Sequence, residues 1–167
     1  MDIDADMTYD AGPVQVMEVI ADPAFQDEKC RQTGALSHVV SVTNPGGRTV
    51  IDTIRGMPMD SLPDFARALL GGKLEVHEVQ DWGPAGADGS RDGQLTVEIL
   101  NTPMRLKGTL AMRPGSADGS NGTTVAIRSE LKANIPFVGG KAEEAAAGPI
   151  RGAITKEQEL GREWLAR

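Results

Sequence analysis

Apolar and polar residues alternate at the start of the chain, over residues 2–10. Ile3, Ala5, Met7 and Tyr9 fall on one side of this alternation, and the aspartates fall on the other. A period of two is typical of a strand with one buried face. The row of aspartates could offer oxygen ligands to calcium, but a solvated face that discourages edge pairing is the simpler interpretation.

Two short helices are predicted next. Pro13 suits the first turn of one helix, and Pro23 suits the first turn of a second helix that ends near Gln32. Asp22 is a good N-cap for this second helix, and Gly34 can close it in the left-handed conformation. The helix pair therefore lies between the first strand and the rest of the chain.

The middle of the chain indicates strands separated by turns. Residues 35–43 are expected to form one strand and residues 48–57 another, each marked by three or four aliphatic residues: Leu36, Val39, Val40 and Val42 in the first, and Val50, Ile51 and Ile54 in the second. The Asn-Pro-Gly-Gly between them is a strong signal for an antiparallel hairpin. A short helix is expected after these two strands, over about residues 60–70. Four more strands are expected over residues 73–82, 94–100, 104–112 and 123–133.

Two details of this strand region are predicted separately. Residues 83–92 and 114–122 are polar and rich in glycine, which indicates two exposed loops. Within the strand at 73–82, the apolar phase shifts between Val76 and Val79, which predicts a β-bulge.

Residues 135–167 predict one long helix. A helix that follows many strands must lie across their sheet, because neither element can bury its apolar face alone. Small residues in its first half either leave a void above the sheet or let the helix sit close to it. Gly148-Pro149 predicts a kink or a split, either as a hinge or as a static bend. The apolar stripe comprises Ala142, Ala146, Ile150, Ala153, Ile154, Leu160, Gly161 and Trp164.

Length and charge narrow the class of protein. The 167 residues indicate one domain, 1–167, and the net charge of −7 argues against nucleic-acid binding, which needs a basic surface. No apolar run approaches the roughly 18 residues of a membrane span. The N-terminus lacks the basic and apolar pattern of a signal peptide. We therefore expect a cytoplasmic protein without integral membrane association.

Motifs for chemistry are absent from the sequence. The one cysteine, Cys30, has no partner for a disulfide and is expected to be a half-buried thiol. The two histidines lie far apart in sequence, which gives a zinc site no support. We accordingly expect no catalytic residue, no metal and no cofactor.

Several short segments carry a resemblance to a known family. They are Leu62-Pro63, Phe65-Ala66-Arg67, Trp82, the run from Ile135 to Lys141, and Glu163-Trp164-Leu165. With the order of the elements, they resemble an uncharacterised bacterial branch of the START-like (SRPBCC, or helix-grip) superfamily. That superfamily includes lipid-transfer START domains, birch-pollen-allergen-like proteins and polyketide cyclases.

The resemblance implies an α+β helix-grip fold. In it, a curved seven-stranded antiparallel sheet wraps around a long C-terminal helix, in the order β-α-α-β6-α with an extra short helix after the third strand. It also implies a cavity for an apolar ligand between sheet and helix. The candidate wall residues are Met7, Tyr9, Arg55, Met57, Met59, Phe65, Leu69, Met104, Leu106, Leu110, Met112, Ala146, Ile150, Ala153, Ile154 and Glu157.

Ionisable residues add a second question. Glu157 falls near the centre of the apolar stripe. If buried, it would have a raised pKa and could act as a polar anchor or general acid; otherwise it would reach water or pair with an arginine. His38, His77, Arg55 and Glu98 lie on strands and could also line the cavity, or be exposed or paired.

Three functions are compatible with these patterns. The first is non-enzymatic binding or transport of a hydrophobic, lipid-like or polyketide-like small molecule. The second is a cyclase or aromatase that uses a titratable group in the cavity. The third is a partner-binding domain without a cavity, which an exposed apolar patch would favour. The ligand and the oligomeric state stay open.

Overall fold

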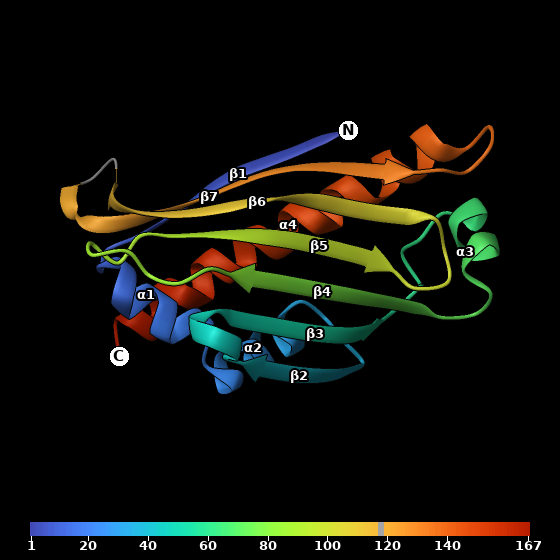
Figure 1. Ribbon diagram of the computed structural model, residues 1–167. Helices are drawn as coiled ribbons and strands as arrows, with labels where there is room; N and C mark the ends of the chain where they lie inside the picture. The colour runs from blue at the N-terminus through green and yellow to red at the C-terminus, as the bar shows by residue number, and fades with distance from the viewer. Residues whose placement is uncertain (117–118) are drawn as a thin grey trace.

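Seven antiparallel strands form one curved sheet in the computed structural model, which describes residues 1–116 and 119–167 (Figure 1). Six consecutive strands form a meander, and the first strand pairs with the last, in the order β1-β7-β6-β5-β4-β3-β2. The strands are β1 (Asp2–Tyr9), β2 (Ser37–Thr43), β3 (Thr49–Met57), β4 (Leu74–Trp82), β5 (Arg91–Ile99), β6 (Met104–Ser116) and β7 (Gly119–Ala133).

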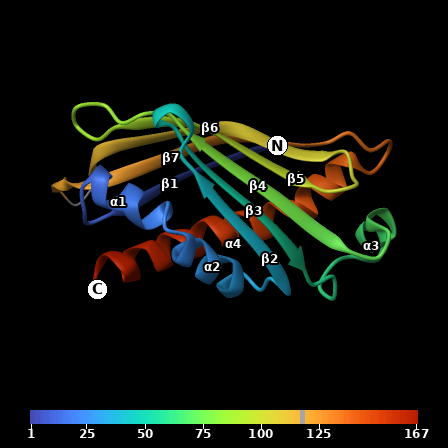
Figure 2. The same ribbon diagram turned by 60° about the horizontal axis from the view of Figure 1, so that its bottom comes forward.

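The helices cover one face of this sheet. Figure 2 shows the longest helix running across the concave side, with two shorter helices beside its C-terminal half and the remaining one at the opposite end of the sheet. The predicted helix-grip fold is confirmed. The helices are α1 (Pro13–Ile20), α2 (Pro23–Gln32), α3 (Asp64–Leu70) and α4 (Gly139–Leu165), and a 3-10 turn, η1 (Pro45–Gly47), joins β2 to β3.

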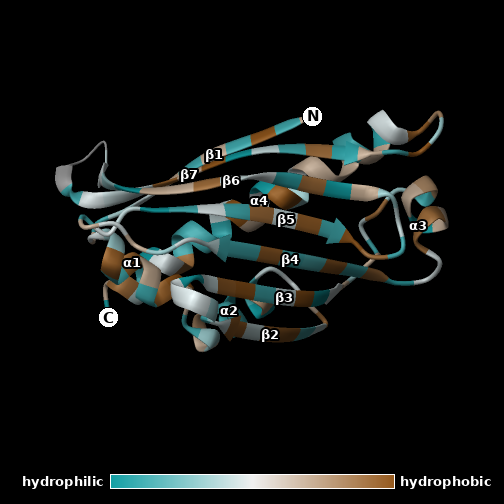
Figure 3. Cartoon of the chain, in the orientation of Figure 1, coloured by the Kyte–Doolittle hydropathy of each residue, from teal (hydrophilic) through white to brown (hydrophobic). Residues whose placement is uncertain are grey.

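The alternation at the N-terminus forms the strand that it predicts. Ile3, Met7 and Tyr9 of β1 are buried, whereas Asp4 and Asp6 are exposed on the other side. Brown and teal residues likewise alternate along the neighbouring strands in Figure 3. One face of the sheet is therefore apolar and lies toward α4, because the hydrophobic effect favours burying that face.

The start of α2 follows its predicted capping. The Asp22 carboxylate accepts a hydrogen bond from the backbone N–H of Ala24 at 2.9 Å, and Pro23 occupies the first turn. This cap satisfies a donor that the helix itself leaves unpaired. It fixes the start of the helix that carries Lys29, which is buried.

Two local predictions are wrong. The pairing of β4 with β3 and β5 is continuous, so there is no bulge between Val76 and Val79. The polar segment 114–122 is largely strand, because β6 extends to Ser116 and β7 begins at Gly119, with residues 117–118 outside the described part. Cross-strand pairing of this long hairpin outweighs the turn propensity of its residues.

Helix α4 is continuous through Pro149, so the predicted split is wrong. The first half of α4 stays helical, with its small residues facing the sheet. Whether the proline acts as a hinge stays a prediction. Among the described residues, no helix combines the length and apolarity that a bilayer span requires.

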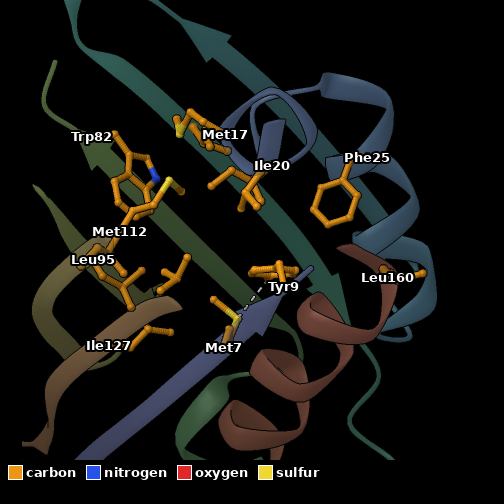
Figure 4. Close-up of a cluster of buried hydrophobic side chains, with 14 of the residues drawn as sticks. Met7, Tyr9, Met17, Ile20, Phe25, Trp82, Leu95, Met112, Ile127 and Leu160 are labelled. Atoms are coloured by element: carbon orange, nitrogen blue, oxygen red, sulfur yellow. Dashed lines mark hydrogen bonds between the residues drawn. The ribbon is translucent and has the colours of Figure 1, made fainter. Parts of the chain in front are cut away.

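The densest part of the core lies where α1, α2 and the second half of α4 meet the sheet. Phe25 of α2 and Trp164 of α4 pack edge to face, with ring centroids 5.5 Å apart. Figure 4 shows Trp82, Met112 and Leu95 on the sheet side of this core, and Ile20 near Phe25 on the helix side. Such aromatic and aliphatic contacts hold the three helices on the sheet.

Candidate functional site

A cavity of about 670 Å3 separates the sheet from α4. Its helical wall includes Ala142, Ala145, Ala146 and Ala153, whose side chains are too small to reach across to the strands. The sequence left open whether these small residues allow close packing or leave a void. The structure shows the void.

The two sides of the cavity differ in polarity. Strands β5, β6 and β7 contribute apolar residues, and Ile150 and Ile154 of α4 face the same space. Strands β3 and β4 contribute charged and polar residues, together with Lys29 of α2 and Glu157 of α4. At one end, α3 and the turn before it add an apolar edge through Ala66 and Leu69 of the helix and Leu62 of the turn. The site is therefore an apolar cavity with one polar side.

Thirteen of the sixteen predicted wall residues lie on this cavity. They come from three strands, β1, β3 and β6, and from two helices, α3 and α4. They are Met7, Tyr9, Arg55, Met57, Leu69, Met104, Leu106, Leu110, Ala146, Ile150, Ala153, Ile154 and Glu157.

The other three predicted wall residues do not line the cavity. Met112 is fully buried in the core beside Trp82 (Figure 4), because it lies far along β6 where the core is filled. Phe65 of α3 is half-buried, and Lys141 Nζ, from the start of α4, sits 5.4 Å from its ring centre. Met59 lies in the turn after β3, half-buried and off the cavity wall.

Four charged side chains form a chain of ion pairs on the polar side, which we call the charge cluster: Lys29, Glu78, Arg55 and Glu157. Lys29, Arg55 and Glu157 are buried, and 13% of the Glu78 side chain is exposed. Lys29 Nζ lies 3.0 Å from Glu157 Oε2 and 3.1 Å from Glu78 Oε1. Arg55 Nη2 donates to Glu78 Oε2 at 3.1 Å. Opposite charges therefore alternate along the cluster, and it joins α2, α4, β3 and β4.

Neighbouring side chains extend this polar network toward Trp82. Gln80 Nε2 donates to Glu78 Oε1 at 3.1 Å, and Gln80 Oε1 accepts from Trp82 Nε1 at 3.0 Å. Arg55 Nε, which is also buried, has no hydrogen-bond partner among the described residues. The network therefore fixes Glu78 firmly but leaves Arg55 with an unused donor.

The pairing keeps Glu78 and Lys29 ionised. Burial alone would raise the pKa of Glu78, but the charges of Lys29 and Arg55 outweigh it and lower that pKa to about 2. Burial alone would lower the pKa of Lys29, but Glu157 and Glu78 outweigh it and raise that pKa to about 12. Counted in formal charges, the cluster has two positive and two negative members.

Tyr9 stands beside this cluster. Burial, with the nearby charge of Glu157, raises the pKa of the Tyr9 hydroxyl far above its usual range, so the hydroxyl is neutral. It donates to Met7 Sδ at 3.6 Å, drawn as a dashed line in Figure 4. Because a thioether is a weak acceptor, this hydroxyl is only loosely engaged.

Sequence reasoning missed Lys29, Glu78 and Gln80 as site residues. The signal was present in β4: counting in steps of two from Val76 leads to Glu78, Gln80 and then Trp82, all on the inner face. The shift in apolar phase near Val79 came from this polar inner face and not from a bulge. Lys29 left no comparable signal, since a lysine in a polar helix ordinarily faces water.

The remaining ionisable candidates lie away from the cavity. His38 Nε2 lies 3.1 Å from Asp27 Oδ1, and His77 Nε2 lies 3.0 Å from Asp52 Oδ1. Glu98 pairs with Arg105 at the sheet surface. In the described part of the chain, no three His, Cys, Asp or Glu side chains are grouped so as to hold a metal.

Comparisons with solved structures support the fold. Human STARD10 superposes with a TM-score of 0.59 at 9% identity, over 96% of this chain and 62% of the other. Norcoclaurine synthase from Thalictrum flavum, in complex with dopamine and hydroxybenzaldehyde, superposes with a TM-score of 0.51 at 14% identity, over 96% and 85%. At such identities, the similarity concerns the fold alone.

Comparisons of sequence identify the family as well as the fold. An uncharacterised protein of Mycobacterium tuberculosis is 26% identical over 119 residues, which cover 71% of this chain and 67% of that protein. Residues 4–165 match the family described as "Protein of unknown function (DUF2505)". Since this match spans nearly the whole chain, strands and long helix together, the protein belongs to the DUF2505 family.

Proposed function

We propose that this protein binds a hydrophobic small molecule in the cavity between the sheet and α4. The cavity is the observation on which the proposal rests: about 670 Å3, with an apolar wall from three strands and one helix. An empty space of this size weakens a core, since the atoms around it lack contacts. A ligand would restore those contacts, and pockets of this size and polarity are typical small-molecule sites.

The structural relatives support the same proposal. Norcoclaurine synthase, which shares this fold, holds two small aromatic molecules, dopamine and hydroxybenzaldehyde. For this chain we propose binding of the ligand alone, without chemical conversion, and in this respect it would differ from a synthase. Lys29 is a protonated ammonium held by two carboxylates and Tyr9 is a neutral phenol, so neither is poised as a nucleophile or base near neutral pH. The third hypothesis, a domain without an internal cavity, does not fit the structure.

A fluorescent probe tests the proposal directly. N-phenyl-1-naphthylamine is uncharged and fluoresces strongly when it leaves water for an apolar site. We expect saturable binding of this probe to the purified protein. We also expect native mass spectrometry to find a hydrophobic molecule retained from the cell.

Two variants of α4 locate the binding. Ala153→Leu places a larger side chain in the cavity, whereas Thr155→Leu makes a similar change on the exposed side of the helix. We expect the first to weaken probe binding by about tenfold or more and the second to leave it unchanged. Equal binding to both variants, or no saturable binding by the wild-type protein, would contradict the proposal.

A further inference from the structure

The charge cluster limits which ligand the cavity can hold. Every charged side chain on the cavity wall already has an ion-pair partner. Lys29, Arg55, Glu78 and Glu157 pair within the cluster, and Lys156 pairs with Glu159 at 3.0 Å near the surface. The cluster itself sums to zero charge.

A charged head group would therefore enter the cavity without a counterion of its own. A carboxylate or phosphate next to Lys29 and Arg55 would also face Glu78 and Glu157, and an ammonium would face the two cations in the same way. Moving an ion from water into such a site is unfavourable unless an unpaired group of opposite charge is there to bind it. A neutral head group does not carry this cost.

The cluster does offer hydrogen bonds of both kinds. Lys29 Nζ uses two of its three donors, and Arg55 Nε uses none among the described residues. Glu157 is bonded through Oε2, and we find no partner for its Oε1 in the described chain. The Tyr9 hydroxyl, engaged only with a thioether, can also accept. Donors and acceptors thus meet on one side of an otherwise apolar space.

The strands on the other side of the cavity offer a surface for the apolar part of the ligand. The wall opposite the cluster is formed by Leu95, Val97, Leu106, Leu110 and Ile127 of β5, β6 and β7. A molecule with its polar end at the cluster would lay its hydrocarbon part against these strands. The cavity therefore has a built-in orientation for an amphipathic ligand.

From this arrangement we infer that the ligand is a largely apolar molecule with an uncharged oxygen head group, a hydroxyl or a carbonyl, held at Lys29, Glu157 and Arg55. The inference rests on the proposed function and specifies its ligand class. A hydroxyl can donate to Glu157 Oε1 and accept from a cationic donor at once, and a carbonyl can accept from one. Fatty acids, phospholipids and long-chain amines fall outside this class.

Competition among molecules with one chain and different heads tests the inference. In this test, protein with bound N-phenyl-1-naphthylamine is titrated at neutral pH with 1-hexadecanol, palmitate, hexadecylamine or hexadecane, and the loss of probe fluorescence is measured. We expect hexadecanol to displace the probe at a concentration at least about tenfold lower than palmitate or hexadecylamine, and also lower than hexadecane. If palmitate or hexadecylamine displaces the probe at the same concentration as hexadecanol or at a lower one, the inference is overturned. If hexadecane equals hexadecanol, the head group is not recognised and the inference fails as well.

A change in cluster charge should change the preference. Glu157→Gln leaves two cations and one carboxylate, so we expect palmitate to gain about tenfold relative to hexadecanol. Arg55→Gln leaves two carboxylates and one cation, so we expect hexadecylamine to gain relative to hexadecanol. Glu163→Gln, an exposed change on the same helix at a residue that does not line the cavity, is the matched control and should leave the order unchanged. An unchanged preference in folded Glu157→Gln and Arg55→Gln proteins would contradict the inference.

The two proposals fail in different ways. If neither the probe nor any of the four chains binds to wild-type protein, the proposed function is wrong and the inference falls with it. If the probe and the chains bind but the head group makes no difference, the cavity is a binding site and only the inference is wrong.

Discussion

Lys29 Nζ on α2 lies 3.0 Å from Glu157 Oε2 on α4, and the two side chains come from opposite ends of the sequence. Both are buried, with 2% and 9% of their side-chain surfaces exposed. Removing one member of such a pair leaves the other charge buried without a full partner, which is costly, whereas an exposed pair contributes little. The pair therefore ties α2 to α4 beside the cavity and should contribute specificity to their docking.

Replacing Lys29 tests this tie. Lys29→Met should lower the free energy of unfolding by about 3–5 kcal/mol, because Glu157 loses its partner and Glu78 one of two. Urea denaturation at neutral pH measures the change. The control is Lys156→Met, which breaks the exposed pair with Glu159 and should cost no more than about 0.5 kcal/mol.

The double variant Lys29→Met, Glu157→Leu separates lost attraction from stranded charge. We expect it to be more stable than Lys29→Met alone, since the unpaired carboxylate is gone and an apolar side chain takes its place. If the double variant is as unstable as the sum of the single ones, the pair is not the source of the loss.

The free energy of unfolding should fall in acid, because the Glu78 carboxylate becomes protonated there. Its pKa lies near 2 in the folded protein against an ordinary 4.5, so folding favours the ionised form. A depressed pKa contributes stability that is present above 4.5 and is lost as the pH falls toward 2. At 1.36 kcal/mol per pKa unit, the contribution is of the order of 3 kcal/mol.

The variant Glu78→Gln isolates this contribution from that of other carboxylates. Urea denaturation at a series of pH values should show a flatter decline between pH 4.5 and pH 2 for the variant than for the wild type. Parallel curves for the two proteins would mean that Lys29 and Arg55 do not hold Glu78 in its ionised form.

The fold was accessible from sequence because its signals are local and repeated. The alternation in β1, the Asp22-Pro23 helix start and the apolar stripe of α4 each specify an element without knowledge of the others. The order of these elements then admits few ways to bury every apolar face. The helix-grip architecture follows from that restriction.

The polar side of the cavity was not accessible in the same way. Its members lie on α2, β3, β4 and α4, and their proximity follows only from the assembled fold. Pattern reasoning assigns charged residues to the surface, which is correct for most lysines and glutamates. Two members were visible in advance: Glu157, because it interrupts an apolar stripe, and Arg55, because it lies on a strand expected to line the cavity. The partner of Glu157, Lys29, could be found only in three dimensions.

The close packing of Tyr9 against α4 leads to a further prediction about stability. A Cβ at Gly161 would lie 2.7 Å from Tyr9 Cε1, so Gly161→Ala should force the ring to move and cost about 1–3 kcal/mol. Gly152 lies on the same helix with no atom within 4 Å of such a Cβ. Gly152→Ala should therefore stabilise the protein by about 0.5–1 kcal/mol, as expected for alanine in a helix.

Thermal unfolding of these two variants gives the measurement. Opposite signs are expected, and the intensity of Tyr9 signals in near-ultraviolet circular dichroism should change in Gly161→Ala alone. If Gly161→Ala proves as stable as the wild type, the ring has room to shift and the contact does not constrain β1 against α4.

Backbone strain at Phe137 yields the last prediction. Phe137 precedes α4 with a φ of 69°, in the left-handed region that bulky residues avoid, and its side chain is completely exposed. No buried contact offsets that strain. Phe137→Gly should therefore raise the free energy of unfolding by up to about 1 kcal/mol, the relief of strain being partly cancelled by the entropy of glycine in the unfolded chain.

For a protein of this size, such a gain corresponds to an increase of about 2–4 °C in the midpoint of thermal unfolding. Phe137→Ala is the matched control, because it removes the ring but keeps the Cβ that causes the strain. It should leave the midpoint close to that of the wild type. A loss of stability in both variants would show instead that the aromatic ring has a packing partner, and the strained backbone would then serve to hold it there.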